Sequence, residues 1–264
     1  MQSNHLAILL HSSKTMRQDA KASQLRTPAL LHEAGELAAF LQTLSPEDIE
    51  KAMHVSSSLA LKTKKVIDAW TPGPHDQSLA IDSFIGDIYS GLRAQELSAA
   101  DREYADSVLY ILSGLYGVLR PYDGISPYRL EMGYLFAGAG FGNLYQFWGS
   151  KIAQQLPKEG VIVNTSSVEY TKAVLSFVDD TRVITPQFLT VNQKTGVPGF
   201  TAVHAKIARG AFARWLITSR ITDPARFKEF NDLGYTFNAS LSNSRTPTFV
   251  CQRFGGIGLS IRLT

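Results

Sequence analysis

The order of the predicted elements is the feature that most constrains the fold of this chain. Helical apolar spacing dominates the first half, whereas short apolar runs bounded by turn residues dominate the second half. One apolar run, residues 6–10, precedes the helices and reads as a buried strand. Because helices and strands do not alternate regularly, the order favours an α+β fold. We therefore expect a single domain over residues 1–264, with a central mixed β-sheet flanked by helices.

Local signals place the individual elements. Thr27-Pro28 and Ser45-Pro46 each put a capping residue before a proline, as at many helix starts. The same reasoning predicts further helices over residues 57–70, 98–112 and 205–221. Strands are predicted over residues 161–164, 182–185, 235–238 and 248–253, with a hairpin between 188–191 and 199–203.

Composition excludes several classes of protein. The chain has 264 residues, of which 44% are hydrophobic and 19% charged, and this balance suffices for a folded core. No apolar run approaches the roughly 18 residues of a membrane span, and no basic leader is evident. Cys251 is the only cysteine, so no internal disulfide can form and a cytoplasmic location is expected. The six histidines are scattered, and we expect neither a metal nor a cofactor.

Charge is distributed unevenly along the chain. Residues 201–264 hold nine Lys or Arg residues against three Asp or Glu residues, although the net charge of the whole chain is only +3. A basic segment of this kind fits a phosphate-bearing partner and equally fits a solvated surface. This last quarter is also a candidate for a separate lobe of the domain.

Several motifs combine glycine, aromatic and ionisable residues. They are FIGDIYSGL (84–92), LSGLYGVLRP (112–121), PYRLEMG (127–133), LYQFWG (144–149), NTSSVEY (164–170), AKIARG (205–210) and GYTF (234–237). Taken in order, they resemble the YaaA family of bacterial peroxide-stress proteins over nearly the whole chain. The block from residue 112 to 149 carries the most specific part of the resemblance.

The resemblance implies a cytoplasmic protein that limits oxidative damage and has a mixed α/β fold with a basic cleft. It also implies DNA binding through a helix-hairpin-helix element. One segment departs from the family, whose N-terminal signature reads Ser-Pro-Ala-Lys-Thr. Here His11-Ser12-Ser13-Lys14-Thr15 stands in its place, so only the lysine and threonine are retained. The departure suggests a divergent member with an altered task.

The two glycines of the segment 112–119 are candidates for contacts with phosphate. Gly114 and Gly117 would let backbone N–H groups approach an anion, with Arg120 and Arg129 adding charge-assisted hydrogen bonds. The alternative is structural: the glycines permit close packing, and Arg120 pairs within the edge of the core. Lys206 and Arg209 share one face of a predicted helix and are the other candidates for nucleic-acid binding. Gly210 beside them indicates close approach by another element.

A second constellation has the composition of an acid–base site. Lys14 follows a predicted strand, where ligand-binding groups collect, and Glu131 and Glu169 lie among aromatics and glycines. These three are the catalytic candidates if the protein is an enzyme. We expect Lys14, Asp87, Arg129, Glu131, Glu169 and Lys206 to surround one cleft, completed by Thr15, Tyr170 and Lys172.

Two functions of different classes follow. In the first, the protein binds double-stranded DNA through a basic cleft and the glycine hairpin. In the second, it is an enzyme whose Lys/Glu pocket acts on a nucleobase-like or phosphate-bearing small molecule. A closed pocket where the motifs meet would favour the enzyme, and an open groove of duplex width would favour DNA.

Overall fold

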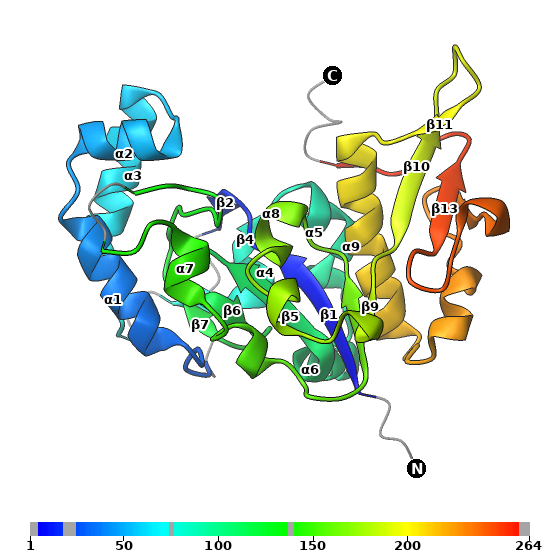
Figure 1. Cartoon of the computed structure of the whole chain (residues 1–264), viewed down its shortest axis with the longest axis horizontal. Coiled ribbons are helices and arrows are strands. Elements are labelled where there is room, and N and C mark those ends of the chain that lie inside the picture. The colour runs from blue at the N-terminus through cyan, green and yellow to red at the C-terminus, as the bar shows by residue number, and fades with distance from the viewer. Residues whose placement is uncertain (1–4, 18–24, 74–76, 137–139, 259–264) are drawn as a thin grey trace.

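The computed structural model describes residues 5–17, 25–73, 77–136 and 140–258. Its centre is a five-stranded mixed sheet, which confirms the predicted fold class (Figure 1). The strand order is β6 (Gly117–Leu119), β5 (Leu109–Ser113), β1 (Leu6–His11), β8 (Val161–Asn164) and β9 (Val183–Ile184). Strand β1 is parallel to both β5 and β8, and its first five residues are buried. Parallel strands buried on both faces explain the continuous apolar run at the N-terminus.

A second sheet, which the sequence did not predict as a separate layer, has four strands. Its order is β11 (Pro198–Gly199), β10 (Gln187–Val191), β13 (Thr248–Cys251) and β12 (Tyr235–Phe237). The neighbours β10 and β13 are parallel, and the other two pairings are antiparallel. Two-stranded pairs join β2 (Thr15–Met16) to β4 (Phe84–Ile85) and β3 (Ser78–Leu79) to β7 (Gly124–Ile125).

Helices surround the central sheet and separate it from the second sheet (Figure 1). They are α1 (Leu31–Gln42), α2 (Pro46–Met53), α3 (Ser57–Ala69), α4 (Ala80–Ser83), α5 (Asp87–Leu92), α6 (Ala99–Val108), α7 (Leu144–Trp148), α8 (Val168–Thr171) and α9 (Ala202–Thr218). Short 3-10 turns lie at Ala94–Glu96, Ala153–Gln155, Leu175–Phe177, Asp180–Arg182, Pro224–Glu229 and Ala239–Leu241. Within the described ranges, no helix is long and apolar enough to cross a membrane.

The predicted helix starts around residue 45 and residue 57 are confirmed. Ser45 accepts a hydrogen bond from the Asp48 amide at 3.1 Å while the Asp48 carboxylate accepts one from the Ser45 amide, which completes a capping box. Ser56 caps α3 in the same way through the Leu59 amide. Helix α1 begins at Leu31, a few residues after Pro28, because residues 28–30 form a turn rather than the first helical turn.

The segment expected to hold the helix-hairpin-helix is a β-hairpin. The helix predicted over residues 98–112 ends at Val108, and the chain continues into β5, which pairs antiparallel with β6. Gly114 and Gly117 are buried where β5 turns into β6, which favours the close packing of the structural alternative over contact with phosphate. A Cβ at Gly117 would lie 2.9 Å from Leu30 and Trp148, so only a glycine lets Trp148 pack there.

Arg120 also makes its contacts within the fold. Its guanidinium lies 4.3 Å from the centre of the Tyr110 ring, and its Nη1 donates to the Tyr110 hydroxyl at 3.2 Å. The Asp106 carbonyl accepts a further hydrogen bond from Nη2. Arg120 therefore holds the end of β6 to the surface of the sheet instead of reaching out toward a phosphate backbone.

The close approach anticipated at Gly210 is the contact between α5 and α9. A Cβ at Gly210 would lie 1.8 Å from the Ile88 carbonyl oxygen, and a Cβ at Gly91 would lie 1.9 Å from the Ile207 carbonyl oxygen. The two helices therefore touch backbone to backbone. This contact fixes the N-terminus of α5 beside the carboxyl end of β1.

Candidate functional site

The carboxyl ends of the three parallel strands β1, β5 and β8 lie at one edge of the central sheet. His11 ends β1, Ser113 ends β5 and Asn164 ends β8, with His11 in register with Leu112. In open α/β sheets this edge is where ligands bind, because the loops that follow the strands diverge there. The motifs of the sequence analysis supply these loops.

Lys14 and Glu131 form an ion pair at this edge. Their Nζ and Oε2 atoms are 2.8 Å apart, and the side chains are 53% and 19% exposed respectively. Arg129, on the same loop as Glu131, donates from Nη1 to the Lys14 carbonyl oxygen at 3.4 Å. The Nε atom of Arg129 is buried and has no hydrogen-bond partner among the described residues. A buried donor without a partner at a sheet edge is a position where a ligand acceptor would be stabilised.

Glycines hold the two acidic side chains in place. A Cβ at Gly114 would lie 2.5 Å from the Leu130 carbonyl oxygen, so the loop before Glu131 rests directly on the β5–β6 hairpin. Gly133 donates its N–H to Glu169 Oε1 at 2.8 Å. Glu169 is therefore an orienting partner of the loop that carries Glu131, rather than a carboxylate free to react.

Buried hydroxyl groups lie beneath the Lys14–Glu131 pair. Ser12 donates to the Tyr170 hydroxyl at 3.2 Å, and the hydroxyls of Ser113 and Tyr128 are 2.6 Å apart. The Tyr89 hydroxyl donates to the His11 carbonyl at 2.9 Å. Burial raises the pKa of all three tyrosines above its usual range, so they remain protonated donors near neutral pH.

His11 is a neutral, fixed ring at the centre of this layer. It stacks on Tyr170 with 5.0 Å between ring centres, and its Nδ1 accepts the Ser167 amide hydrogen at 3.2 Å. Burial, together with the positive charges of Arg209 and Lys206, lowers the pKa of His11 to about 3. Because Nδ1 accepts a hydrogen bond, the neutral ring carries its proton on Nε2.

Two cations on α9 face the same edge. Arg209 is partly buried, and burial lowers its pKa. Within the described ranges, no carboxylate lies within 4 Å of its guanidinium. Lys206 lies one helical turn earlier and is exposed, and its positive charge also lowers the pKa of His11. A desolvated arginine without an acidic partner gives this edge a preference for anions.

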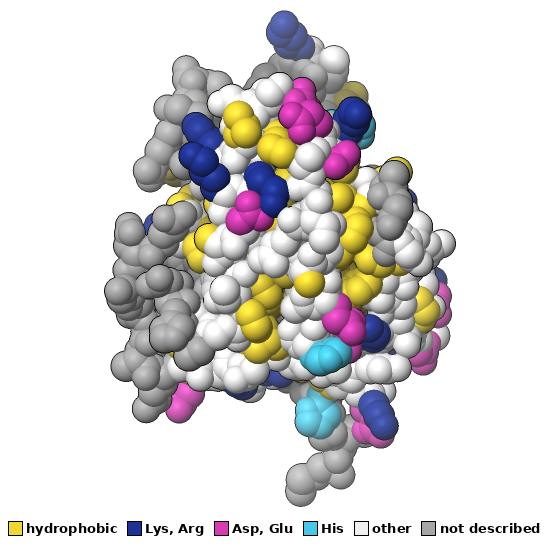
Figure 2. All heavy atoms as spheres, turned by 90° about the vertical axis from the view of Figure 1, so that its left-hand side faces the viewer, with side chains coloured by type: hydrophobic (Ala, Val, Ile, Leu, Met, Phe, Trp, Pro, Cys, Tyr) yellow, Lys and Arg dark blue, Asp and Glu magenta, His cyan; other side chains and the backbone are white. Residues whose placement is uncertain are grey.

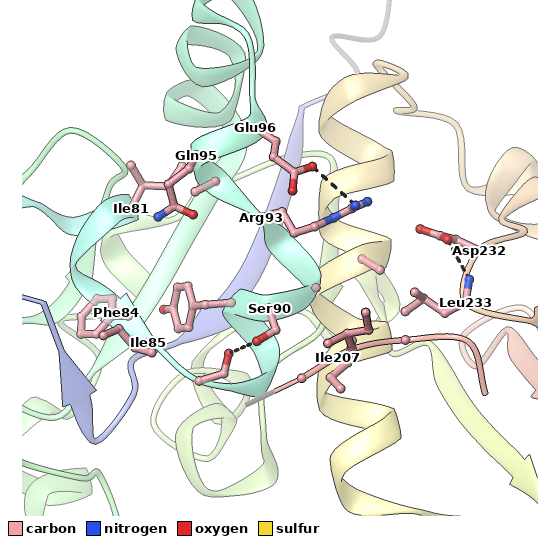
Figure 3. Close-up of a pocket in the computed structure, with 18 of the residues that line it drawn as sticks. Ile81, Phe84, Ile85, Ser90, Arg93, Gln95, Glu96, Ile207, Asp232 and Leu233 are labelled. Carbon is pink, nitrogen blue, oxygen red and sulfur yellow. Dashed lines mark hydrogen bonds and ion pairs between the residues drawn. The ribbon is translucent and has the colours of Figure 1, made fainter. Parts of the chain in front are cut away.

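A cavity of about 540 Å³ adjoins this edge between α5, α9 and residues 255–258 (Figure 3). Gly86 and Tyr89 form the wall shared with the strand edge: Ser13 Oγ donates to the Ile85 carbonyl, and Tyr89 reaches His11. Apolar residues line the cavity beside the charged pair Arg93 and Glu96, whose charged groups are 3.4 Å apart. Its size and mixed lining suit a small organic molecule.

The structure brings some of the predicted residues together and leaves others apart. Lys14, Arg129 and Glu131 are in direct contact, with Glu169 and Tyr170 in the adjoining layer and Lys206 and Arg209 facing His11. Thr15 is an exposed residue of β2, and Lys172 is an exposed residue at the end of α8. Asp87 lies near Gly258, where a Cβ would be 2.9 Å from its Oδ1 atom, on the side of the cavity.

Ion pairs neutralise part of the charge of the basic last quarter. Arg214, Arg220 and Arg245 pair with acidic residues from earlier in the chain, namely Glu96, Asp101 and Asp180. Arg226 pairs with Glu229 on the same turn. The charge excess of this quarter is therefore smaller at the surface than the sequence indicates. Among its described cations, Lys206 and Arg209 lie close enough to His11 to lower its pKa.

Sequence reasoning missed the hydroxyl layer. Ser12, Ser113 and Tyr128 were not named as site residues, although each lies inside a motif that was singled out. Their position supplied a usable signal: Ser12 follows β1 directly, and Ser113 ends β5. Polar residues at the ends of buried strands lie at the edge where ligands bind, so they indicate a site as well as charged residues do.

The fold defines a mixed α/β protein in which lysine, arginine and glutamate side chains gather at the carboxyl edge of the central sheet. The family model for the peroxide stress protein YaaA matches residues 6–241. A UPF0246 protein of Salinispora tropica is 54% identical over 97% of this chain and 98% of its own length. A UPF0246 protein of Burkholderia vietnamiensis is 39% identical over 92% and 98% respectively. The chain belongs to the YaaA family of peroxide stress proteins.

Proposed function

We propose that this protein is an enzyme of peroxide defence that acts on a phosphate-bearing or nucleobase-like small molecule at the sheet edge. The contact between Lys14 and Glu131 carries the proposal. A lysine and a glutamate from distant parts of the sequence meet there above buried hydroxyls. The buried Nε atom of Arg129, which has no hydrogen-bond partner among the described residues, lies beside them. Such mixed chemistry exceeds what binding of a phosphate alone requires.

Each group has a role that its surroundings support. Glu131 is the general acid–base residue, because it is mostly buried, and the phenol of Tyr134, whose pKa is raised by burial and by this carboxylate, lies beside it. Lys14 is more exposed and supplies positive charge to the substrate. Arg129 and Arg209 bind the anionic part of the substrate, and Glu169 orients the loop through Gly133.

The test is a turnover assay with nucleosides and nucleoside monophosphates, followed by chromatography of the products. We expect the parent protein to consume at least one of them. Glu131→Gln should lower the rate by about 100-fold or more, which is the scale of general acid–base catalysis. Lys14→Met should also lower it, because the substrate loses a charge partner.

Lys158→Met and Glu159→Gln are the matched controls. Both residues are exposed and lie on the turn before β8, away from the sheet edge. They should react like the parent. If no nucleoside or nucleotide is consumed, or if Glu131→Gln reacts at the parental rate, the enzyme proposal is wrong.

DNA binding is a second proposal, supported by the helix pair α2–α3 rather than by the glycine hairpin. The two helices pack together and are joined by a short turn in which His54 is left-handed, with φ of 50°. Ser56 accepts from the Leu59 amide, so the Ser57 and Ser58 amides of the first turn of α3 are the ones offered to a phosphate group. Lys51, Lys62 and Lys65 are exposed on this pair.

The surface around this helix pair supports only modest affinity. In Figure 2, Lys and Arg side chains on this side of the molecule alternate with Asp and Glu instead of forming a continuous basic strip. Three phosphate contacts predict a slope of roughly −3 for log K against log salt. Replacing Lys62 and Lys65 by Gln should remove about two units of that slope. A slope near zero for the parent protein in a duplex titration would exclude this mode of binding.

A further inference from the structure

A second pocket lies at the carboxyl edge of the parallel strands β10 and β13. Thr190 of β10 is in register with Cys251 of β13, so residues 192–194 and 252–254 leave the second sheet side by side. Helix α9 lies against β10, and its N-terminus lies at the same edge (Figure 1). The pocket has a volume of about 670 Å³ and does not include Lys14 or Glu131.

The lining of this pocket is basic. Lys194, His204 and Arg253 line it, together with threonine, asparagine and glutamine side chains, and no Asp or Glu does so within the described part of the chain. Neither Lys194 nor Arg253 lies within 4 Å of a carboxylate of any described residue. Most of the other described arginines in the last quarter form ion pairs. This pocket differs because two cations without such a pair, Lys194 and Arg253, lie beside it.

A chain of hydrogen bonds holds the ring of His204 in place. Its Nδ1 lies 3.1 Å from the Thr190 hydroxyl, which in turn lies 3.1 Å from the hydroxyl of the buried Tyr235. With Tyr235 donating to Thr190 and Thr190 donating to Nδ1, the neutral imidazole carries its proton on Nε2. Phe254 stacks on the His204 ring with 4.0 Å between the ring centres, and a Cβ at Gly256 would overlap Phe254, so Gly256 allows the chain to pass close to this stack.

The N-terminus of α9 adds uncapped amides. Thr201 lines the pocket at the N-cap position, its side chain makes no capping hydrogen bond, and the first turn has no acidic residue. The positive end of a 17-residue helix therefore faces the same space as the cations. Helix, lysine, arginine and imidazole N–H all favour one ligand chemistry.

We propose that this pocket binds the phosphate group of a phosphate-bearing ligand. Lys194 and Arg253 supply the charge, His204 donates from Nε2, and the first amides of α9 complete the site. The ligand differs in place from the substrate of the sheet edge: Thr201 and His204 of α9 face this pocket, whereas Lys206 and Arg209 face His11. The proposal therefore stands whether or not the sheet edge is catalytic.

The test is calorimetric titration of the full-length protein with inorganic phosphate, adenosine monophosphate and a short oligothymidylate. Lys194→Gln with Arg253→Gln should weaken phosphate binding by about 100-fold, because two charge-assisted hydrogen bonds are lost. His204→Phe keeps the stack on Phe254 but removes the N–H donor, and should weaken it by about tenfold. Lys158→Gln is the control on an exposed lysine elsewhere, and Lys14→Met measures how much of the phosphate binding belongs to the sheet edge.

Retained phosphate binding in Lys158→Gln, with loss in the pocket variants at an unchanged melting temperature, would support the proposal. If the pocket variants bind adenosine monophosphate more weakly than the parent but bind the oligonucleotide equally well, the phosphate belongs to a small molecule. If the oligonucleotide loses affinity as well, the phosphate belongs to a nucleic-acid strand. The proposal fails if no probe binds the parent protein, or if the pocket variants bind phosphate as the parent does.

Discussion

At the scale of single residues, His11 is one of three residues that separate this chain from the Ser-Pro-Ala-Lys-Thr signature. The ring fills the space between Tyr170 and the loop after β8, where its Nδ1 accepts hydrogen bonds. Burial and two neighbouring cations hold its pKa near 3, well below 6.5 in an unfolded chain. Between pH 3 and pH 6.5, His11 is therefore protonated in the unfolded state but not in the folded state.

His11 should therefore make the protein sensitive to acid. The contribution of neutral His11 to the free energy of unfolding is fully present above pH 6.5. It is lost as the pH falls toward 3, at about 1.4 kcal/mol per pH unit. His11→Phe, which keeps an aromatic ring against Tyr170, should show a flatter decline in stability between pH 6.5 and 4.5. Urea denaturation at a series of pH values measures this decline.

His32→Gln is the control for that series. The side chain of His32 is 84% exposed on α1, and its replacement should leave the pH dependence of the parent unchanged. Equal slopes for the parent and His11→Phe would mean that His11 is protonated in the folded protein, contrary to its buried position.

At the scale of elements, the contact between α5 and α9 positions the candidate site. Gly91→Ala or Gly210→Ala would place a methyl group within 2 Å of a carbonyl oxygen of the facing helix. We expect a loss of about 3 kcal/mol in the free energy of unfolding, the upper range for overpacking in a core. Thermal denaturation measures the loss.

Gly35→Ala in α1 is the matched control, because nothing lies within 4 Å of the added methyl group. Alanine favours a helix over glycine, so this variant should gain roughly 0.5 to 1 kcal/mol. A melting temperature for Gly210→Ala equal to that of the parent would contradict the backbone contact between the helices.

The elements also show what could be predicted from the sequence. Capping residues identified the starts of α2 and α6 because a cap acts through its own neighbours. The end of α6 was missed because the run 109–112 is uniformly apolar, and such a run reads equally well as buried helix or buried strand. Pairing with β1 and β6 decides that it is a strand, and this pairing is a long-range property.

At the scale of the whole molecule, the candidate site is assembled from segments that are far apart in sequence. Loops after β1, β5 and β8, the segment 127–133 and helix α9 all contribute. Composition and motif content singled out most of these segments, but not which of their side chains would meet. Charge shows the same limit: the basic quarter was evident in the sequence, whereas its pairing with Glu96, Asp101 and Asp180 depends on the fold.

The central claim is that the Lys14–Glu131 edge performs the task of this family member. The most direct measurement is survival under hydrogen peroxide of bacteria that lack their own YaaA-type protein and carry this chain or a variant. We expect the parent, Lys158→Met and Glu159→Gln to restore survival, and Lys14→Met and Glu131→Gln to fail at equal protein levels and melting temperatures. Full protection by Lys14→Met and Glu131→Gln would mean that the Lys14–Glu131 edge does not carry the function.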